Sequence, residues 1–449
     1  MISVLSVCLN YIQLIYPIAN MSSEEGLPYW LAALFIVPAI IGIILALTIA
    51  ATAPQPYPRG CRKIGLGPTS RSNLDDEYDY DERGLHNRAN SLPKDKRRIT
   101  IKALFSYPIK SCKGVEFPAA EFNETGLPYD RQFCFAEYIE RAASSEADST
   151  GKEVAPEGRW DARTLRDGKF SAMTLIRPEI WVPDPNSPTY LPDAPEVQSN
   201  GVMIVHFPRQ TSNPFIKLAM AIGVCDPEES FRVPLDPPED DLKYPRLPVR
   251  IFKNVTTGVS YATHLPPTLS KFLQTTKPLS LFRSLPPSDH PRYVRGNTTG
   301  KIEAELGFEP VRAYADEYPL QFQNLGSVRA LAKKIETSIP RFSVRRFRPN
   351  VVLEGCDAFF EDNWTKVRVV SGSDQKKKNS NGVLIHVCCR TVRCRLPNVD
   401  PDTGIRHAVE PDKTLRATRA IDPGAPGGGC LGMMMVPAEK SEYTVFALS

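Results

Sequence analysis

Short segments of alternating apolar and polar residues, each ended by proline or glycine, restrict this chain to a fold dominated by β-structure. The folded part opens at Ile99 with ITIKALFSYPIKS and continues with RQFCFAEYI, VMIVHF, NVVLEG, KVRVVSG and GVLIHVC. A period of two with Gly or Pro at the ends is typical of strands. Helical sequence is scarcer: we expect helices at TLSKFLQ and SVRALAKKIE, the second with Ser327 as its N-cap. The chain therefore predicts an α+β fold that is mainly β.

Length and charge narrow the classes of protein further. A chain of 449 residues is long enough for two or three domains. A net charge of +4, with no basic face interleaved with aromatic residues, gives no support to nucleic-acid binding. Ten cysteines without regular spacing indicate reduced thiols and a protein that faces the cytosol.

An uncharged apolar run, LAALFIVPAIIGIILALTIAATA, covers residues 31–53. It is long enough to cross a bilayer, so we predict a transmembrane helix over 27–53. Arg59, Arg62 and Lys63 follow the run, which predicts that the C-terminal side stays cytoplasmic. A signal peptide is the alternative. Residues 1–26 are read as a leader, either a weaker second membrane segment or a dispensable one.

The polar stretch after the run predicts a disordered linker over residues 54–98. It holds an acidic block, DDEYDYDE at residues 75–82, and a basic end, KDKRR. Too few apolar residues are present to build a core. Residues 99–285 are then predicted as a first β-barrel-like domain with a proline-rich insertion at about 183–248, and residues 286–449 as a second β-dominated domain.

Cys394 is the residue that points most directly to chemistry. Arg393 and Arg395 flank it and are expected to favour the thiolate, which is the form that ligates metals. The prolines and glycine of LPNVDPDTG fix the backbone just after it. A rigid thiolate suits a soft metal, and an ordinary free cysteine beside a loop is the alternative.

Two other uses of the cysteines stay open. His386, Cys388, Cys389 and Cys394 could form a zinc site, but their spacing matches no common zinc motif. A cysteine nucleophile would need a histidine base, for which His386 and His407 are the candidates.

Separated cations point to an anionic ligand. Lys110 and Ser111 lie at the end of a predicted strand, Arg131 follows a turn, and Arg348 with Asn350 comes just before another strand. Lysine, arginine and a hydroxyl in loops suit a phosphate group. Each of them, taken alone, is more often a solvated surface residue.

These segments, in this order, resemble the MOSC superfamily, and within it the membrane-anchored amidoxime-reducing molybdenum enzymes, in a fungal-type form. The resemblance rests on YPIKSCKG and LPYDRQF in the first domain. In the second domain it rests on YADEYPL, RFRPNVVLEG with FFEDNW, and RCRLPNVDPDTG with EPDKTLRATR. It implies a MOSC N-terminal β-barrel domain followed by a MOSC β-barrel domain.

The resemblance also implies a molybdenum cofactor, with Cys394 as catalytic residue and metal ligand. The pterin and its phosphate would be held by a set from both domains: Lys110, Ser111, Arg131, Asp316, Tyr318, Arg348 and Asn350. The implied reaction is reduction of small N-hydroxylated substrates with electrons from a b-type cytochrome and a flavin-dependent reductase. The implied location is the mitochondrial outer membrane or the endoplasmic reticulum, and pyridoxal phosphate binding is a further term attached to the family.

Three departures from the family pattern concern the predicted site. Met433 and Met434 stand where an aromatic residue is expected near the pterin, Glu317 stands where a small residue is common, and the closing strand at the C-terminus is expected to be altered or missing. A non-catalytic carrier of the cofactor or of sulfur, and a tethered scaffold with a degenerate barrel, are the alternatives to an enzyme.

Overall fold

The computed structural model describes residues 36–43, 56–67, 70–78, 99–140, 158–238, 242–294, 304–370, 382–438 and 444–447. Contacts divide the chain into two compact units. The first is Met1–Tyr57 with Phe207–Ser230, and the second is Pro58–His206 with Phe231–Ser449.

The first unit holds two short helical stretches, residues 36–43 and α5 (Pro214–Ala221). Asn213 caps α5, because its side chain accepts a hydrogen bond from the Phe215 amide. No helix among the described residues has both the length and the apolar character that crossing a bilayer requires. Residues 36–43 are the described part of the predicted membrane helix 27–53; the rest of it, and the predicted leader 1–26, lie outside the described residues.

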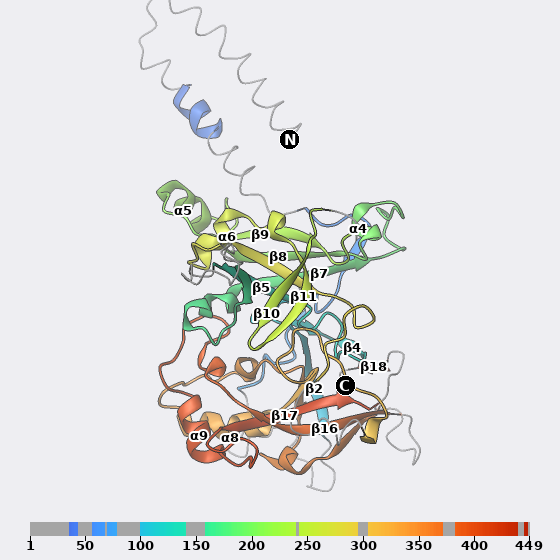
Figure 1. Cartoon of the computed structure of the whole chain (residues 1–449). Coiled ribbons are helices and arrows are strands. Elements are labelled where there is room, and N and C mark those ends of the chain that lie inside the picture. The colour runs from blue at the N-terminus through green and yellow to red at the C-terminus, as the bar shows by residue number, and fades with distance from the viewer. Residues whose placement is uncertain are drawn as a thin grey trace, which may run out of the picture. The chain divides into compact units, whose positions relative to one another are not determined.

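A closed five-stranded barrel in the second unit forms the centre of the first domain (Figure 1). Its strands, in order around the barrel, are β10 (Arg246–Ile251), β11 (Asn254–Ser260), β12 (Leu279–Ser284), β5 (Phe133–Ile139) and β6 (Arg159–Ala162). Alternate residues of these strands point inward, so Cys134, Ala136, Val249, Ile251 and Phe282 form the core. The helices η4 (Ala262–His264) and α6 (Pro267–Phe272) lie between β11 and β12.

A seven-stranded sheet is the framework of the second domain. Its strand order is β15-β16-β17-β13-β14-β2-β3. The bounds are β15 (Lys366–Val369), β16 (Val383–Val392), β17 (Cys430–Pro437), β13 (Leu320–Asn324), β14 (Val351–Glu354), β2 (Thr100–Ser106) and β3 (Val115–Phe117). β2 pairs with β14, and β3 pairs with β2 at the edge of the sheet. The predicted boundary between residues 285 and 286 therefore does not separate the sheet from the N-terminal segment.

Helices cover one face of this sheet. Figure 1 shows α8 (Leu325–Ile335) and α9 (Asp412–Arg419) close together beside β17. Alternation along β2 separates two cores: Ala103 and Phe105 pack with α8, whereas Leu104 packs on the opposite face with Phe322. The N-cap of α8 is Asn324, not the predicted Ser327, because the Asn324 side chain accepts from the Gly326 amide.

Part of the predicted linker is folded. β1 (Cys61–Lys63) pairs with β7 (Arg177–Pro183) at the edge of a sheet of order β1-β7-β8-β9. The other strands are β8 (Val202–Pro208) and β9 (Glu228–Pro234). The helix η3 (Gly168–Leu175) precedes β7, and α4 (Pro195–Gln198) lies between β7 and β8 in sequence. Leu74 is buried in the same core as α8. The disordered linker predicted for 54–98 is therefore wrong for residues 56–67 and 70–78; the remainder lies outside the described residues.

The C-terminal segment supplies a strand. β18 (Thr444–Ala447) pairs antiparallel with β4 (Ala119–Phe122) and forms a two-stranded sheet. The closing strand that we expect to be altered or missing is thus present, paired with the first domain's N-terminal segment.

Candidate functional site

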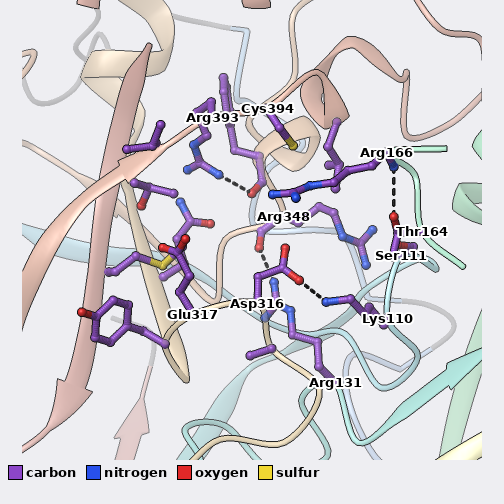
Figure 2. A pocket seen from close by; sticks show the side chains of 18 of the residues that line it. Lys110, Ser111, Arg131, Thr164, Arg166, Asp316, Glu317, Arg348, Arg393 and Cys394 are labelled. Atoms are coloured by element: carbon purple, nitrogen blue, oxygen red, sulfur yellow. Dashed lines mark hydrogen bonds and ion pairs between the residues drawn. The ribbon is translucent and has the colours of Figure 1, made fainter. Parts of the chain in front are cut away.

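One pocket in the second unit is lined by all eight residues that the sequence singled out. Lys110 and Ser111 come from the loop between β2 and β3, and Arg131 from the turn before β5. Asp316 and Tyr318 come from the loop before β13. Arg348 and Asn350 come from the loop before β14, and Cys394 from the loop after β16. Figure 2 shows six of these side chains around the pocket: Lys110, Ser111, Arg131, Asp316, Arg348 and Cys394. Five cationic side chains and two carboxylates line it, so the pocket favours an anion.

Lys110 is held at the floor of the pocket. Its ammonium group donates to the Tyr314 carbonyl at 2.9 Å and forms an ion pair with Asp316. Burial lowers the pKa of Lys110, and Asp316 opposes this shift. Burial alone would raise the pKa of Asp316, but Lys110 outweighs it and that pKa is lowered. The ion pair opposes the effect of burial on both groups and fixes their positions.

Arg131 is held by three partners. Its guanidinium pairs with Asp130 at 2.5 Å and donates to the Asn350 side-chain oxygen at 3.1 Å and to the Arg348 carbonyl at 2.9 Å. The Asn350 amide nitrogen donates in turn to the Phe105 carbonyl. Since both ends of the Asn350 side chain bind protein groups, Asn350 orients Arg131 in the described structure.

Arg348 keeps a buried donor that finds no partner among the described residues. Its Nη2 atom is buried and makes no hydrogen bond to any residue that the structure describes, while the guanidinium stacks on the Tyr107 ring at 4.2 Å. Burial lowers the pKa of Arg348 to about 10. An unsatisfied buried donor is costly, and an anion in the pocket would satisfy this one.

Backbone strain gathers around the pocket. Ser111, Arg131, Phe252 and Arg348 all have φ in the left-handed region, at 71°, 48°, 54° and 54°. Residues other than glycine rarely adopt this conformation, and it persists where the surroundings enforce it. Four such residues in one pocket lining indicate that the fold holds these side chains in place at a cost in backbone energy.

The loop that carries Cys394 is braced from both ends. Asp400 accepts hydrogen bonds from the backbone amides of Asp402 and Thr403, and it pairs with Arg346 at 2.6 Å. Gly404, at φ 71°, makes the turn that follows. The short helix η7 (Leu396–Asn398) begins just beyond the thiol. A hydrogen-bonded turn therefore follows Cys394 at the position that the prolines and glycine predict.

The arginine nearest in function to the Cys394 thiol is neither Arg393 nor Arg395, the two that flank it in the sequence. Arg395 points away and donates to the Ala408 carbonyl at 2.7 Å. Arg393 donates to the Leu431 and Phe347 carbonyls and to the Gln323 side chain. The guanidinium that interacts with the Cys394 thiol in the pocket lining belongs to Arg166. Burial acts to lower the pKa of Arg166, but Cys394 and Asp316 outweigh it and raise that pKa.

The remaining wall of the pocket contains the family departures. Glu317 lines it, and burial together with Asp316 raises the Glu317 pKa. Met434 also lines the pocket, whereas Met433 is buried in the core of the opposite sheet face. Tyr318 is buried and hydrogen-bonds Cys389, whose pKa burial raises to about 12.

Neither alternative use of the cysteines is supported by the described residues. Within the described ranges, no group of three or more His, Cys, Asp or Glu side chains is arranged to hold a metal ion. The His407 ring nitrogen Nδ1 accepts from the Glu410 amide at 2.8 Å, and His386 faces Glu305 at 3.3 Å. Neither histidine is among the residues that line the pocket.

The domain comparison matches both halves of this site. Residues 98–141 match the MOSC N-terminal β-barrel domain, and residues 309–441 match the MOSC domain. This chain contains a MOSC N-terminal domain and a MOSC domain. The two matches contain all eight predicted site residues, so the pocket lies between segments of a MOSC N-terminal domain and a MOSC domain.

The chain is also similar in sequence to several curated proteins, the mitochondrial amidoxime reducing components. It is 37% identical over 130 residues to mitochondrial amidoxime reducing component 2 of Macaca fascicularis, covering 29% of this chain and 35% of that one. It is 35% identical over 130 residues to the human protein of that name, with the same coverages. It is 28% identical over 203 residues to mitochondrial amidoxime-reducing component 1 of Danio rerio, covering 43% and 56%. The chain is homologous to these proteins, and it matches about a third to just over half of their length.

The MOSC-domain pocket fits the cofactor that the family implies. The free thiol of Cys394 is a soft ligand, and the separated cations with the unsatisfied Arg348 Nη2 suit a phosphate and other anionic groups. This fit is supported by the combination of the Cys394 thiol with the cationic side chains, and by the buried Arg348 Nη2 atom, which an anion would satisfy.

Several lining residues escaped the sequence prediction. Arg166, Thr164 and Phe252 come from loops in the barrel domain, and Gln321 and Thr391 come from strands of the sheet. Arg393 lines the pocket itself, whereas the sequence indicates it only as a charge beside Cys394. No motif marks the loop residues, because their position depends on how the barrel loops return to the sheet. The conformation of Phe252 gives no signal either, since a positive φ at a bulky residue cannot be read from sequence.

Proposed function

We propose that this MOSC-domain protein is a molybdenum-cofactor-dependent reductase of small N-hydroxylated, amidoxime-type substrates. The observation that carries the proposal is the pairing, in one pocket, of a free thiol with separated cations that include an unsatisfied buried guanidinium nitrogen. The names of the homologues support the reaction class. Pyridoxal phosphate binding has no comparable support among the described residues, and we do not propose it.

Each lining residue has a role that follows from its contacts. Cys394 would ligate the metal through its sulfur, because the braced loop holds that atom in the pocket. Arg348, Arg131, Lys110 and Ser111 would bind the anionic part of the cofactor. When bound, the cofactor supplies the two electrons for the reduction in which oxygen leaves nitrogen as water.

Two lining residues would act differently from the others. Asn350 would position Arg131, as it does in the described structure. The Glu317 carboxyl, whose raised pKa favours the protonated form, is the group in the lining best suited to deliver a proton to the departing oxygen. Asp316 is unsuited to this because Lys110 lowers its pKa.

The electron donors and the cellular location of this protein are part of the proposal. Electrons would arrive from a b-type cytochrome and its flavin-dependent reductase. The names of the homologues place those proteins at mitochondria. For this chain we propose a membrane location, at the mitochondrial outer membrane or the endoplasmic reticulum.

The direct test is benzamidoxime reduction by full-length protein made in a host that synthesises the cofactor. Electrons are supplied by a reconstituted cytochrome and flavin reductase, and amidine formation is followed. We expect turnover by the wild type and none by Cys394→Ala, whereas Cys389→Ala, which changes a neighbouring thiol outside the pocket lining, should remain active.

A second outcome would favour a non-catalytic carrier. A wild-type protein that holds molybdenum firmly but reduces none of a panel of N-hydroxylated compounds would be a binding module, and the enzymatic proposal would be wrong.

A further inference from the structure

Residues 75–78, the described part of the acidic block that the sequence assigns to a tether, contact the folded domain. Asp76 pairs with Lys102 of β2 at 2.9 Å, and Tyr78 lies under the Arg341 guanidinium at 4.5 Å. Just before the block, Asn73 donates to Glu116 of β3 through its amide at 2.8 Å. Residues 70–78 are therefore fixed at several points to the second unit.

Glu77 makes the most buried of these contacts. It is 4% exposed, and its carboxylate accepts from the Val344 amide at 3.0 Å. The Ser343 hydroxyl donates to the same carboxylate. Burial raises the Glu77 pKa, and these hydrogen bonds oppose the shift. The Arg329 guanidinium donates to the Glu77 carbonyl at 3.4 Å and holds the backbone of the block.

The Val344 amide is the first N–H of η5 (Val344–Phe347), a helix that reaches both sides of the pocket. The first amides of a helix have no partner within it. The Ser343 side chain accepts from the Arg345 amide, and the Glu77 carboxylate accepts from the Val344 amide. Glu77 thus acts as a second cap that comes from a distant part of the chain.

Side chains of η5 contact both the loop that follows Cys394 and the part of the pocket that contains Arg348. Arg346 donates to the Pro397 and Asn398 carbonyls of η7 and pairs with Asp400. Phe347 lines the pocket and packs against the Arg393 guanidinium at 4.9 Å. At the end of η5, Arg348 turns into the left-handed region and presents its unsatisfied nitrogen.

We propose that Glu77 is a positioning residue, which anchors η5 and thereby holds Arg348 and the Cys394 loop in the geometry that receives the cofactor. The inference rests on the proposed function for the identity of the ligand, and on the contacts of Glu77 for the anchoring. Residues 70–78 would then contribute to the geometry of the cofactor site.

The experiment compares full-length wild type with Glu77→Met, Glu77→Gln and Glu116→Ala. Methionine keeps the volume of the side chain and removes its acceptor, whereas glutamine keeps an acceptor oxygen. Glu116→Ala removes the anchor of Ser72 and Asn73 and leaves the Glu77 contact in place, so it is the matched control. Two quantities are measured for each protein: amide hydrogen exchange over residues 343–348, and molybdenum content after extensive desalting.

We expect Glu77→Met to exchange at least about fivefold faster over residues 343–348 and to retain several-fold less molybdenum, as the loss of a helix-capping bond implies. Glu77→Gln should match the wild type in both the exchange rate and the molybdenum content. Glu116→Ala should speed exchange over residues 70–75 alone.

Wild-type exchange and wild-type molybdenum retention in Glu77→Met would overturn the inference, as would equal losses in Glu77→Met and Glu116→Ala. If the wild type itself holds no molybdenum, the exchange comparison still decides whether Glu77 anchors η5. The missing metal then counts against the proposed function.

Discussion

At the scale of single residues, the site depends on where each guanidinium is directed and not on its distance from Cys394 along the chain. Arg395 is adjacent to the thiol but faces a backbone carbonyl, whereas Arg348 is 46 positions away and presents an unsatisfied nitrogen to the pocket. The two residues can therefore be separated by one experiment.

The phosphate dependence of thermal unfolding tests this difference in cofactor-free protein. A ligand that binds only the folded state raises the melting temperature. We expect inorganic phosphate to stabilise the wild type and Arg395→Ala alike. In Arg348→Ala the phosphate affinity should fall about 10- to 100-fold, as the loss of a charge-assisted hydrogen bond implies. Equal phosphate responses in Arg348→Ala and Arg395→Ala would show that the anion binds elsewhere.

The carboxylate of Asp400 gives the thiol loop a dependence on pH. Burial would raise the Asp400 pKa, but the amide of Thr403 and the Arg346 guanidinium outweigh it, so the pKa lies below its ordinary value of 3.8. A carboxylate with a depressed folded-state pKa stabilises the fold above the unfolded value, and this is lost as the pH falls through the folded value. Asp400→Asn should therefore be less stable than wild type to urea at pH 7.

The stability gap between wild type and Asp400→Asn should narrow below about pH 4. Urea unfolding at pH 7, 5 and 3.5 measures this gap. A gap that stays constant over this range would mean that the charge of Asp400 contributes nothing to the loop.

At the scale of elements, the start of α8 shows how a cap is chosen by tertiary contacts. Ser327 fits the cap pattern in the sequence, but its hydroxyl donates to Glu361 at 2.6 Å and accepts from the Phe359 amide at 2.7 Å. Asn324, three residues earlier, accepts from the Gly326 amide and donates to Glu361 at 2.8 Å. The helix begins earlier because β13 runs directly into it.

Replacing Asn324 by alanine should cost about 2 kcal/mol or more in free energy of unfolding, because it removes a cap and leaves buried Glu361 short of a donor. Asn213→Ala is the control, since Asn213 caps exposed α5 with a single bond to the Phe215 amide and should cost about 1 kcal/mol or less. Urea unfolding compares the two variants. A cost for Asn324→Ala no larger than that for Asn213→Ala would refute the role of the buried network.

Element types were predicted well from sequence, and their partners were not. The strand segments at β2, β5, β8, β14, β15 and β16 and the helices α6 and α8 lie where period and end signals predict them. A period of two identifies a strand but carries no information on which strand lies beside it. For the same reason the folded state of residues 70–78 was missed, since one leucine and one glutamate find their partners on elements far along the chain.

At the scale of the whole molecule, the second unit joins sequence segments that a simple domain division would separate. β2 and β3 precede the barrel in sequence but belong to the sheet of the MOSC domain, and Lys110 and Arg131 flank the transition. The pocket is therefore built where the chain passes between the two domains. All eight predicted residues meet there because their motifs mark the ends of strands, which this topology brings together.

Molybdenum content of the full-length protein, made in a host that synthesises the cofactor, tests the central claim most directly. Elemental analysis should find close to stoichiometric molybdenum in the wild type and in Cys389→Ala, and almost none in Cys394→Ala, with all three proteins folded. A folded wild type without molybdenum, or a Cys394→Ala variant that holds as much as the wild type, would contradict the claim that this thiol and these cations form a molybdenum-cofactor site.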